Sequence, residues 1–406
     1  MRTTWNFYSA GTLIFGNGAI SQLGRRCLER GWHRALVVTD QNLVQAGIVP
    51  RVEQILHDAK IAVSVFAEGQ PEPSVALAIS AAERADAFRP QVIIGLGGGS
   101  NIDLAKFAAV LVKHGGGPAQ YDPKQFFSFN NVPGPVLPIV GIPTTAGTGS
   151  EVSHAAVLTD TENHIKVSTL SNHLRPALAL VDPELTFTCP KKVTADSGID
   201  ALTHAIEAYT AIDSTQLPIP PDEDVAYSGS HPLGDCLAEK AIELVGKHLP
   251  AAVADGTNKV AREGMALAST IAGLAFSNCA VALVHALEYP LGAVLHCSHG
   301  AGNGLLLPYV MRFNLPAKLA AFARIAHLLG EDTRGCNEQE AAERAIAAVE
   351  RLREKIGIPT RIRDLGGTRE QLPTFAAKAF AIKRLRDVNP RVPTEADLLG
   401  ILEAAY

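Results

Sequence analysis

Residues 92–106 read Val92-Ile-Ile-Gly-Leu-Gly-Gly-Gly-Ser-Asn-Ile-Asp-Leu-Ala-Lys106 and indicate the class of fold. An apolar run predicts a buried strand, and a helical pattern starts near Ile102. The residues between them, Gly97, Gly98, Gly99 and Ser100, predict a phosphate-binding loop. Glycine removes the Cβ atoms that would keep a phosphate away from the backbone, and a helix N-terminus presents unpaired N–H groups to an anion. A tight turn would also explain the glycines, and their spacing differs from the G-x-G-x-x-G fingerprint.

The order of apolar and amphipathic segments around this stretch predicts two domains. Short apolar runs at 35–39, 61–66, 92–95 and 136–141 alternate with helical stretches such as 43–59 and 74–87, which is typical of a parallel α/β sheet. Beyond about Cys189 the chain is rich in Ala, Leu, Ile and Glu, and predicts helices at 194–209, 236–253 and 261–276. We therefore predict an α/β domain over residues 1–188 and a helical domain over residues 189–406, with a ligand site in the cleft between them.

The composition excludes several classes of function. The 406 residues carry a formal charge of -5, with 47% hydrophobic and 19% charged residues, a balance typical of a globular protein. Because there is no Lys/Arg-rich block, we expect no nucleic-acid partner. No apolar run approaches ~18 residues, and the N-terminus lacks the pattern of a signal peptide. We therefore expect no membrane association, a cytoplasmic location and a small-molecule ligand.

A second polar loop follows the next predicted strand and runs from Pro143 to Glu151. It alternates hydroxyls with glycines, and its candidate ligand residues are Thr144, Thr145, Thr148, Gly149 and Ser150. Hydroxyl oxygens can bond ribose or phosphate, while glycines let a loop fold around a nucleotide. Each of these residues could instead serve a local turn, but two such loops in one α/β domain favour a nucleotide site.

Asp40 ends the predicted strand at 35–39. A carboxylate at the C-terminal end of a strand can accept hydrogen bonds from ribose hydroxyls, which would favour NAD over NADP. The same residue could be the N-cap of the helix that starts near Asn42. The sequence leaves these two roles open.

Four residues in the second half of the chain form a candidate metal site. Asp200 and His204 are four apart in a strongly helical stretch, so both side chains project from one face. His285 lies in another helical stretch, and His299 lies in a Cys-Ser-His-Gly turn. Three imidazoles and one carboxylate suit Fe²⁺ or Zn²⁺. Each histidine alone could be a packing or capping residue, and the chain has 13 of them.

Taken together, these segments resemble the iron-containing (group III) alcohol dehydrogenases, which are related in fold to dehydroquinate synthase and glycerol dehydrogenase. The resemblance covers nearly the whole chain and is carried by four parts: Gly97 to Lys106, Pro143 to Glu151, Gly198 to Glu207, and the pair His285 and His299. It implies an α/β N-terminal dinucleotide-binding domain followed by an all-α C-terminal metal-binding domain, a dehydroquinate synthase-like fold. It also implies an active site between the domains and a homodimer.

The resemblance assigns roles residue by residue. The family's four metal ligands match Asp200, His204, His285 and His299, and its pyrophosphate loop matches Gly97 to Ser100. Residues that line the cofactor match Thr144, Thr145, Thr148 and Ser150, and we include Gly149 and Asp103 with them. Asp40 matches the carboxylate that prefers NAD, and Lys166 aligns with a lysine near the nicotinamide ribose.

Three features depart from the family pattern. Many members carry a histidine four residues after the third ligand, where this chain has Tyr289; with a reference pKa near 10, a tyrosine is a poor proton carrier at neutral pH. His296 is a candidate substitute. Glu72 replaces a common asparagine near the cofactor, and a proline-rich segment at 213–233 reads as an irregular insertion. These features are similar to the hydroxyacid-oxoacid transhydrogenase branch of the same superfamily.

We therefore predict a metal-dependent, NAD(H)-linked oxidoreductase that interconverts a primary alcohol, or a related hydroxy acid, and its aldehyde. Its cofactors are NAD(H) and one divalent ion, Fe²⁺ before Zn²⁺. The alternatives are a hydroxyacid-oxoacid transhydrogenase, a dehydroquinate synthase-like lyase and a non-catalytic nucleotide-binding protein. Intact metal ligands would have no purpose in the last of these.

Overall fold

The computed structural model describes residues 2–163, 165–220 and 222–406, and the chain divides into two compact units. One unit comprises Tyr8–Cys189, and the other comprises Pro190–Tyr406 together with the residues up to Phe7. Those first residues join the helical unit through their aromatic side chains. The Trp5 ring stacks on the imidazole of His231, with ring centroids 4.3 Å apart.

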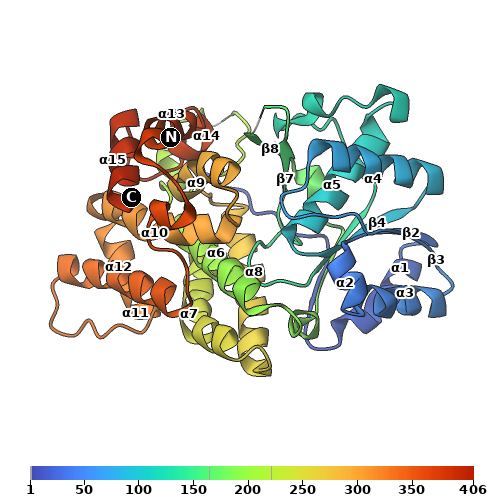
Figure 1. Cartoon of the computed structure of the whole chain (residues 1–406), viewed down its shortest axis with the longest axis horizontal. Helices are drawn as coiled ribbons and strands as arrows, with labels where there is room; N and C mark the ends of the chain where they lie inside the picture. The colour runs from blue at the N-terminus through green and yellow to red at the C-terminus, as the bar shows by residue number, and fades with distance from the viewer. Residues whose placement is uncertain (1, 164, 221) are drawn as a thin grey trace. The chain divides into compact units, whose positions relative to one another are not determined.

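The α/β unit is built on a six-stranded parallel sheet (Figure 1). The strand order is β1-β9-β6-β4-β2-β3, and every pair in it is parallel. The strands are β1 (Leu13–Phe15), β2 (Arg34–Val38), β3 (Ala62–Phe66), β4 (Val92–Gly97), β6 (Ile139–Pro143) and β9 (Leu178–Val181). After β3 the chain returns to the other side of β2, where it adds β4 and then β6. The strands β4 and β6 therefore lie at the centre of the sheet.

Helices cover both faces of this sheet, which is why its central strands β4 and β6 are apolar and buried along their whole length. Alternate residues of β2 enter opposite cores: Leu36 and Val38 pack on one side, and Ala35 and Val37 on the other. All four are fully buried. The helices are α1 (Leu23–Leu28), α2 (Gln41–Gln45), α3 (Ile48–Asp58), α4 (Val75–Phe88) and α5 (Gly99–His114).

Two local differences from the sequence prediction have clear causes. The single helix predicted at 43–59 is two helices, α2 and α3, because Gly47 adopts a left-handed conformation between them with φ 76°. The strand predicted at 136–141 starts later, at Ile139. Pro138 has no N–H to donate to a ladder, so it precedes β6 instead of joining it.

A second, three-stranded sheet in this unit was not predicted. It contains β5 (Ser128–Phe129), β7 (Ala155–Asp160) and β8 (Ile165–Leu170), in the order β5-β8-β7. β7 and β8 are antiparallel and pair from Ala155 with Leu170 to Asp160 with Ile165. This hairpin leads directly out of the polar loop at 143–151.

The other unit is helical in its described part. Its helices are α6 (Lys191–Thr210), α7 (Pro232–Ala254), α8 (Lys259–Phe276), α9 (Leu283–Leu295), α10 (His299–Asn314), α11 (Leu319–Leu328), α12 (Glu338–Lys355), α13 (Leu372–Phe380), α14 (Lys383–Asp387) and α15 (Glu395–Ala405). Helices α6, α7 and α8 pack against one another, and α10 packs against both α6 and α9 (Figure 1). These contacts bring α6, α9 and α10 together.

Several helices of this unit begin at a side-chain cap. Ser298 accepts a hydrogen bond from Ala301 N and starts α10, and Asn337 and Glu340 form a capping box at α12. The irregular segment that the prolines predicted lies between α6 and α7. An isolated β-bridge pairs Asp213 with Ser230 within it. No helix in the described residues is long and apolar enough to span a bilayer.

Candidate metal centre and nucleotide-binding loops

Three helices of the helical unit supply the four candidate ligands. Asp200 and His204 are one turn apart on α6, His285 lies in the first turn of α9, and His299 is the first residue of α10. The four ligand atoms all lie within 4.8 Å of one another. The structure thus brings together all four residues that the sequence analysis selected.

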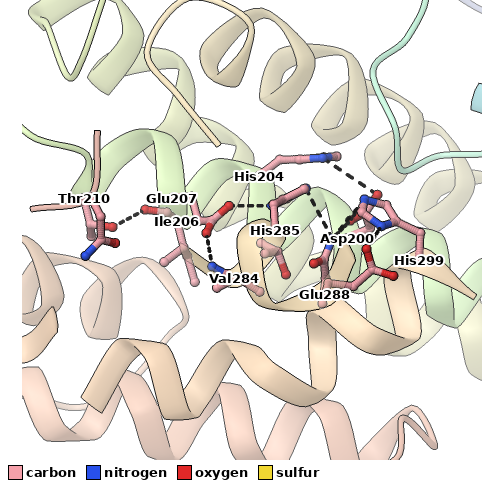
Figure 2. Close-up of polar contacts among 12 residues, drawn as sticks. Asp200, His204, Ile206, Glu207, Thr210, Val284, His285, Glu288 and His299 are labelled. Atoms are coloured by element: carbon pink, nitrogen blue, oxygen red, sulfur yellow. Dashed lines mark hydrogen bonds and ion pairs between the residues drawn. The ribbon is translucent and has the colours of Figure 1, made fainter. Parts of the chain in front are cut away.

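The cluster has one oxygen donor facing the imidazole nitrogens. Oδ2 of Asp200 lies 3.9 Å from Nε2 of His204, and Oδ1 lies 3.9 Å from Nε2 of His299 (Figure 2). Asp200, His204 and His285 are buried, whereas the side chain of His299 is 32% exposed. The solvent side of the cluster is therefore the side of His299.

Two further carboxylates orient two of the histidines. Nδ1 of His285 lies 2.5 Å from Oε2 of Glu207, and Nδ1 of His299 lies 2.5 Å from Oε2 of Glu288 (Figure 2). A carboxylate accepts hydrogen bonds and cannot donate them, so each of these imidazoles carries its proton on Nδ1. The Nε2 lone pairs then face the cluster, as metal ligation requires.

The side chain of Asn303, on α10, contacts three of the four candidate ligands. Its Nδ2 donates to Oδ1 of Asp200 at 2.8 Å, and it lies 3.2 Å from Nε2 of His285 and 3.1 Å from Nε2 of His299. The side chain is fully buried. The amide therefore fixes the position of the Asp200 carboxylate relative to two histidines on other helices.

Burial keeps His204 neutral. It lowers the pKa of His204 to about 4, although the nearby Asp200 carboxylate acts in the opposite direction. Burial would raise the pKa of Asp200, but the three histidines and Asn303 together hold that pKa below its ordinary value. At neutral pH the site thus offers a neutral His204 imidazole and an ionised Asp200 carboxylate.

Aromatic rings border the ligands. The Phe276 ring stacks on His204 with centroids 4.3 Å apart. Tyr289 is half-buried, and its ring centroid lies 6.4 Å from that of His285 and 6.1 Å from that of His299. His296, the other proton-relay candidate, is exposed, and its left-handed backbone (φ 52°) caps the end of α9. Of the two candidates, Tyr289 is the one whose ring lies next to the ligands.

The donor set fits a divalent transition metal. Three imidazole nitrogens and one carboxylate oxygen converge from three helices, and hydrogen bonds hold Nδ1 of His285, Nδ1 of His299 and Oδ1 of Asp200. Such N/O sets suit Fe²⁺ and Zn²⁺. Four convergent donors of this kind can hold one ion and leave its solvent side open to a substrate.

The α/β unit carries the predicted phosphate loop at the C-terminal end of β4. Gly97 adopts φ 143°, and a Cβ there would lie 2.2 Å from Nδ2 of Asn101. Gly98 is the N-cap of α5, and Gly99 and Ser100 form the first turn of that helix. The strand, the glycines and the helix N-terminus therefore have the arrangement that the sequence predicted, with N–H groups available to an anion.

The loop at 143–151 packs onto this helix start. Thr144 N donates to Gly97 O at 3.0 Å, and a Cβ on Gly99 would lie 2.7 Å from Cγ2 of Thr148. A Cβ on Gly98 would have Thr145 as its nearest neighbour, at 3.6 Å. The candidate residues of the two loops are thus side by side, and the glycines are what permits this contact.

Asp103 and Ser150 have internal partners in this structure. Oγ of Ser150 donates to Oδ1 of Asp103 at 2.5 Å, and Oδ2 of Asp103 accepts from Val157 N at 3.0 Å. The fully buried Lys106 donates to Ser150 Oγ at 3.0 Å and to Ala155 O at 2.8 Å. Burial lowers the pKa of Lys106 to about 8, with Asp103 opposing that shift. This network anchors the loop at 143–151 to α5.

Asp40 has the capping role that the sequence analysis left open. Its Oδ1 accepts from Leu43 N at 3.1 Å, as the N-cap of α2, and its Oδ2 accepts from Nδ2 of Asn101 at 2.7 Å. Each carboxylate oxygen has two lone pairs, so these bonds leave acceptor capacity for a ribose. Lys166, on β8, forms an ion pair with Glu72 at 3.0 Å.

Four residues of these sites were missed by the sequence analysis: Glu207, Glu288, Asn303 and Lys106. Only helical spacing could have indicated them. Glu207 follows His204 by three residues, Glu288 follows His285 by three, and Asn303 follows His299 by four, so each shares a helix face with a ligand. Such spacing is common on any helix, and the partners of Glu288 and Asn303 include residues on other helices.

Comparison with known proteins identifies relatives over the whole chain. A family model described as iron-containing alcohol dehydrogenase matches residues 10–183, and one described as the C-terminal part of the same family matches residues 223–406. The NAD-dependent methanol dehydrogenase of Bacillus methanolicus is 36% identical over 403 residues, which is 98% of this chain and 99% of that one. The 1,3-propanediol dehydrogenase of Klebsiella pneumoniae is 38% identical, with 97% and 96% covered.

The structural comparison agrees. The crystal structure of a 1,3-propanediol oxidoreductase superposes with a TM-score of 0.91 at 36% identity, covering 99% of this chain and 100% of that one. The relatives and the family models point to the same fold and the same chemistry as the four clustered ligands.

Proposed function

This chain belongs to the iron-containing alcohol dehydrogenase family, and on that premise we propose that it oxidises a small primary alcohol to its aldehyde with NAD⁺, and reduces the aldehyde with NADH, at one Fe²⁺ held by Asp200, His204, His285 and His299. The observation that carries the proposal is the convergence of these four donor atoms within 4.8 Å. Zn²⁺ suits the same donors and is the second candidate metal.

The bound groups would supply the chemistry that the side chains lack: the ion would serve as a Lewis acid for the hydroxyl or carbonyl oxygen, and the nicotinamide would exchange hydride. Asp200, His204, His285 and His299 would hold that ion. Phe276 and Tyr289 provide an apolar border beside the ligands, which suits a small carbon skeleton.

We assign the dinucleotide to the loops of the α/β unit. The N–H groups at Gly99 and Ser100 would receive the pyrophosphate, and Thr144, Thr145, Thr148, Gly149 and Ser150 would line the nucleoside parts. Asp103 and Lys106 keep that loop in place. Asp40 would accept from the adenosine ribose, and Lys166 would lie near the nicotinamide ribose, as the family resemblance implies.

The proton route is the least conventional part of the proposal. Tyr289 can orient a substrate hydroxyl through its own hydroxyl, but a phenol with a reference pKa near 10 is a poor proton carrier at pH 7. His296 is the second candidate. Tyr289→Phe removes the hydroxyl and keeps the ring; if Tyr289 orients the substrate, kcat falls while metal content stays unchanged.

A substrate panel separates this function from its alternatives. Purified protein reconstituted with Fe²⁺ or Zn²⁺ is assayed with methanol, ethanol, 1,3-propanediol and a 4-hydroxy acid, with NAD⁺ and with or without 2-oxoglutarate. Net formation of NADH with a simple alcohol supports the dehydrogenase. Turnover of the 4-hydroxy acid only when 2-oxoglutarate is present, without net NADH, would instead establish the transhydrogenase. The matched control is His204→Ala, which should lose both bound metal and turnover.

We also propose that the chain forms a homodimer, as the family resemblance implies. Light scattering on the purified protein tests this directly. A mass near twice 42.9 kDa is expected, and a mass of one chain would contradict it.

A further inference from the structure

Glu288 is fully buried in α9, and its partner is a ligand on another helix. It follows His285 by three residues, yet its Oε2 lies 2.5 Å from Nδ1 of His299, which begins α10. The carboxylate therefore links the helix of the third ligand to the ring of the fourth. His299 is the most exposed of the four ligands, so it has the least surrounding protein to hold its ring.

The neighbouring helix is adapted to this carboxylate. Gly302 lies in the interior of α10, where glycine is less favourable than alanine by about 1 kcal/mol. A Cβ at Gly302 would lie 2.8 Å from Cγ of Glu288 and 3.4 Å from its Oε1. The absence of a side chain at Gly302 thus makes the room in which Glu288 reaches His299.

We infer that Glu288 is a positioning residue of the metal centre, which holds His299 with its proton on Nδ1 and its Nε2 lone pair toward the ion. A neutral imidazole can carry its proton on either nitrogen, and only the Nδ1–H form can both donate to Glu288 and bind a metal through Nε2. Without the acceptor, the ring can rotate and both tautomers are populated. Outer carboxylates of this kind typically change metal affinity by ~10–100-fold.

The inference rests on the proposed metal site, and its test measures metal binding without turnover. Metal-free protein is titrated with Co²⁺ against a competing chelator, and the visible absorption of the bound ion is recorded. The variants are Glu288→Ala, Glu288→Gln and Gly302→Ala. Gly400→Ala is the matched control. Gly400 lies in α15, and a Cβ at this position would meet no atom within 4 Å. Far-UV circular dichroism of each metal-free variant verifies the fold.

Glu288→Ala should weaken Co²⁺ binding by ~10–100-fold and alter the absorption spectrum. Glu288→Gln keeps an acceptor oxygen for Nδ1–H, so its spectrum should remain close to wild type, with a smaller loss of affinity. Gly302→Ala displaces Glu288 without changing it and should resemble Glu288→Ala. Gly400→Ala should bind Co²⁺ like wild type.

Two results would overturn the inference. Wild-type affinity and spectrum in both Glu288→Ala and Gly302→Ala would show that Glu288 does not position the ligand. Equal losses of Co²⁺ affinity in Glu288→Gln and Glu288→Ala would show that metal binding depends on the negative charge of Glu288 and not on its role as an acceptor for Nδ1–H. If Glu288→Ala does not fold, the Gln and Gly302 variants decide the question alone. Failure of the wild-type protein to bind Co²⁺ would count against the proposed function instead.

Discussion

His204 is the ligand for which burial has the clearest electrostatic consequence. Its folded pKa of about 4 lies below the ordinary value of 6.5, so the unfolded chain binds a proton that the folded, metal-free chain does not bind. Between about pH 6.5 and pH 4 the free energy of unfolding of the metal-free protein should therefore fall as the pH falls. This group contributes at most ~1.4 kcal/mol per pH unit.

Urea unfolding of the metal-free protein between pH 4.5 and pH 7 measures this slope. The matched variant is His204→Gln, which cannot titrate and should lose this part of the pH dependence. Equal slopes for the two proteins would show that His204 is not held neutral by burial.

At the scale of single residues, the four ligands could be predicted from the sequence, whereas the residues that hydrogen-bond to them could not. Asp200, His204, His285 and His299 are recognisable because the chemistry restricts which residue types can bind the ion and the resemblance supplies their order. Glu288 and Asn303 are not recognisable in this way. Their role depends on contacts between helices that are distant in the chain or separated by a turn, and a buried glutamate or asparagine has many other uses.

At the scale of elements, the start of α5 is where strand, loop and helix must meet closely. A Cβ on Gly99 would lie 2.7 Å from Cγ2, 2.8 Å from Oγ1 and 2.9 Å from Cβ of Thr148, so Gly99→Ala must displace that threonine. The substitution should raise KM for NAD⁺ by ~10-fold, which corresponds to about 1.4 kcal/mol of lost binding. Metal content should not change.

Initial-rate kinetics and metal analysis of Gly99→Ala test this prediction, with Gly400→Ala as the control for an alanine in an unobstructed helix position. An unchanged KM for NAD⁺ would mean that the cofactor does not use this loop.

The elements themselves were predictable to different degrees. The strand at 92–97 and the helices α6 and α8 follow from long, strongly patterned segments. β1 and β9 were missed because they have only three and four residues, and β5 pairs only at Ser128 and Phe129. The break between α2 and α3 depends on the backbone of one glycine, Gly47, and hydrophobic periodicity does not reveal it.

At the scale of the whole molecule, we expect the helical unit to bind the metal and the α/β unit to bind NAD⁺. A ligand that binds the folded state stabilises it by about 2.7 kcal/mol at 100 times its Kd. Added metal should therefore protect amides of α6, α9 and α10 from hydrogen exchange, and added NAD⁺ should protect the segments at 97–103 and 143–151. Mass spectrometry of peptides from the two units measures both effects. Protection of the Tyr8–Cys189 unit by metal alone would contradict the assignment.

The prediction of two domains came from the change near Cys189, where alternating strand and helix patterns give way to helical patterns alone. The placement of the first residues was not predicted, because the stacking of Trp5 on His231 joins positions that are 226 residues apart, from 5 to 231. Periodicity identifies elements, but the contacts between distant segments come from packing.

A titration of metal-free protein with Fe²⁺ under anaerobic conditions, with bound iron and NADH formation from a primary alcohol measured on the same samples, tests directly whether the four-ligand site carries the activity. We expect activity to rise in proportion to bound iron, to reach its maximum at one ion per chain, and to be absent in His285→Ala. Full alcohol-dependent NADH formation by protein that contains no metal would contradict this expectation.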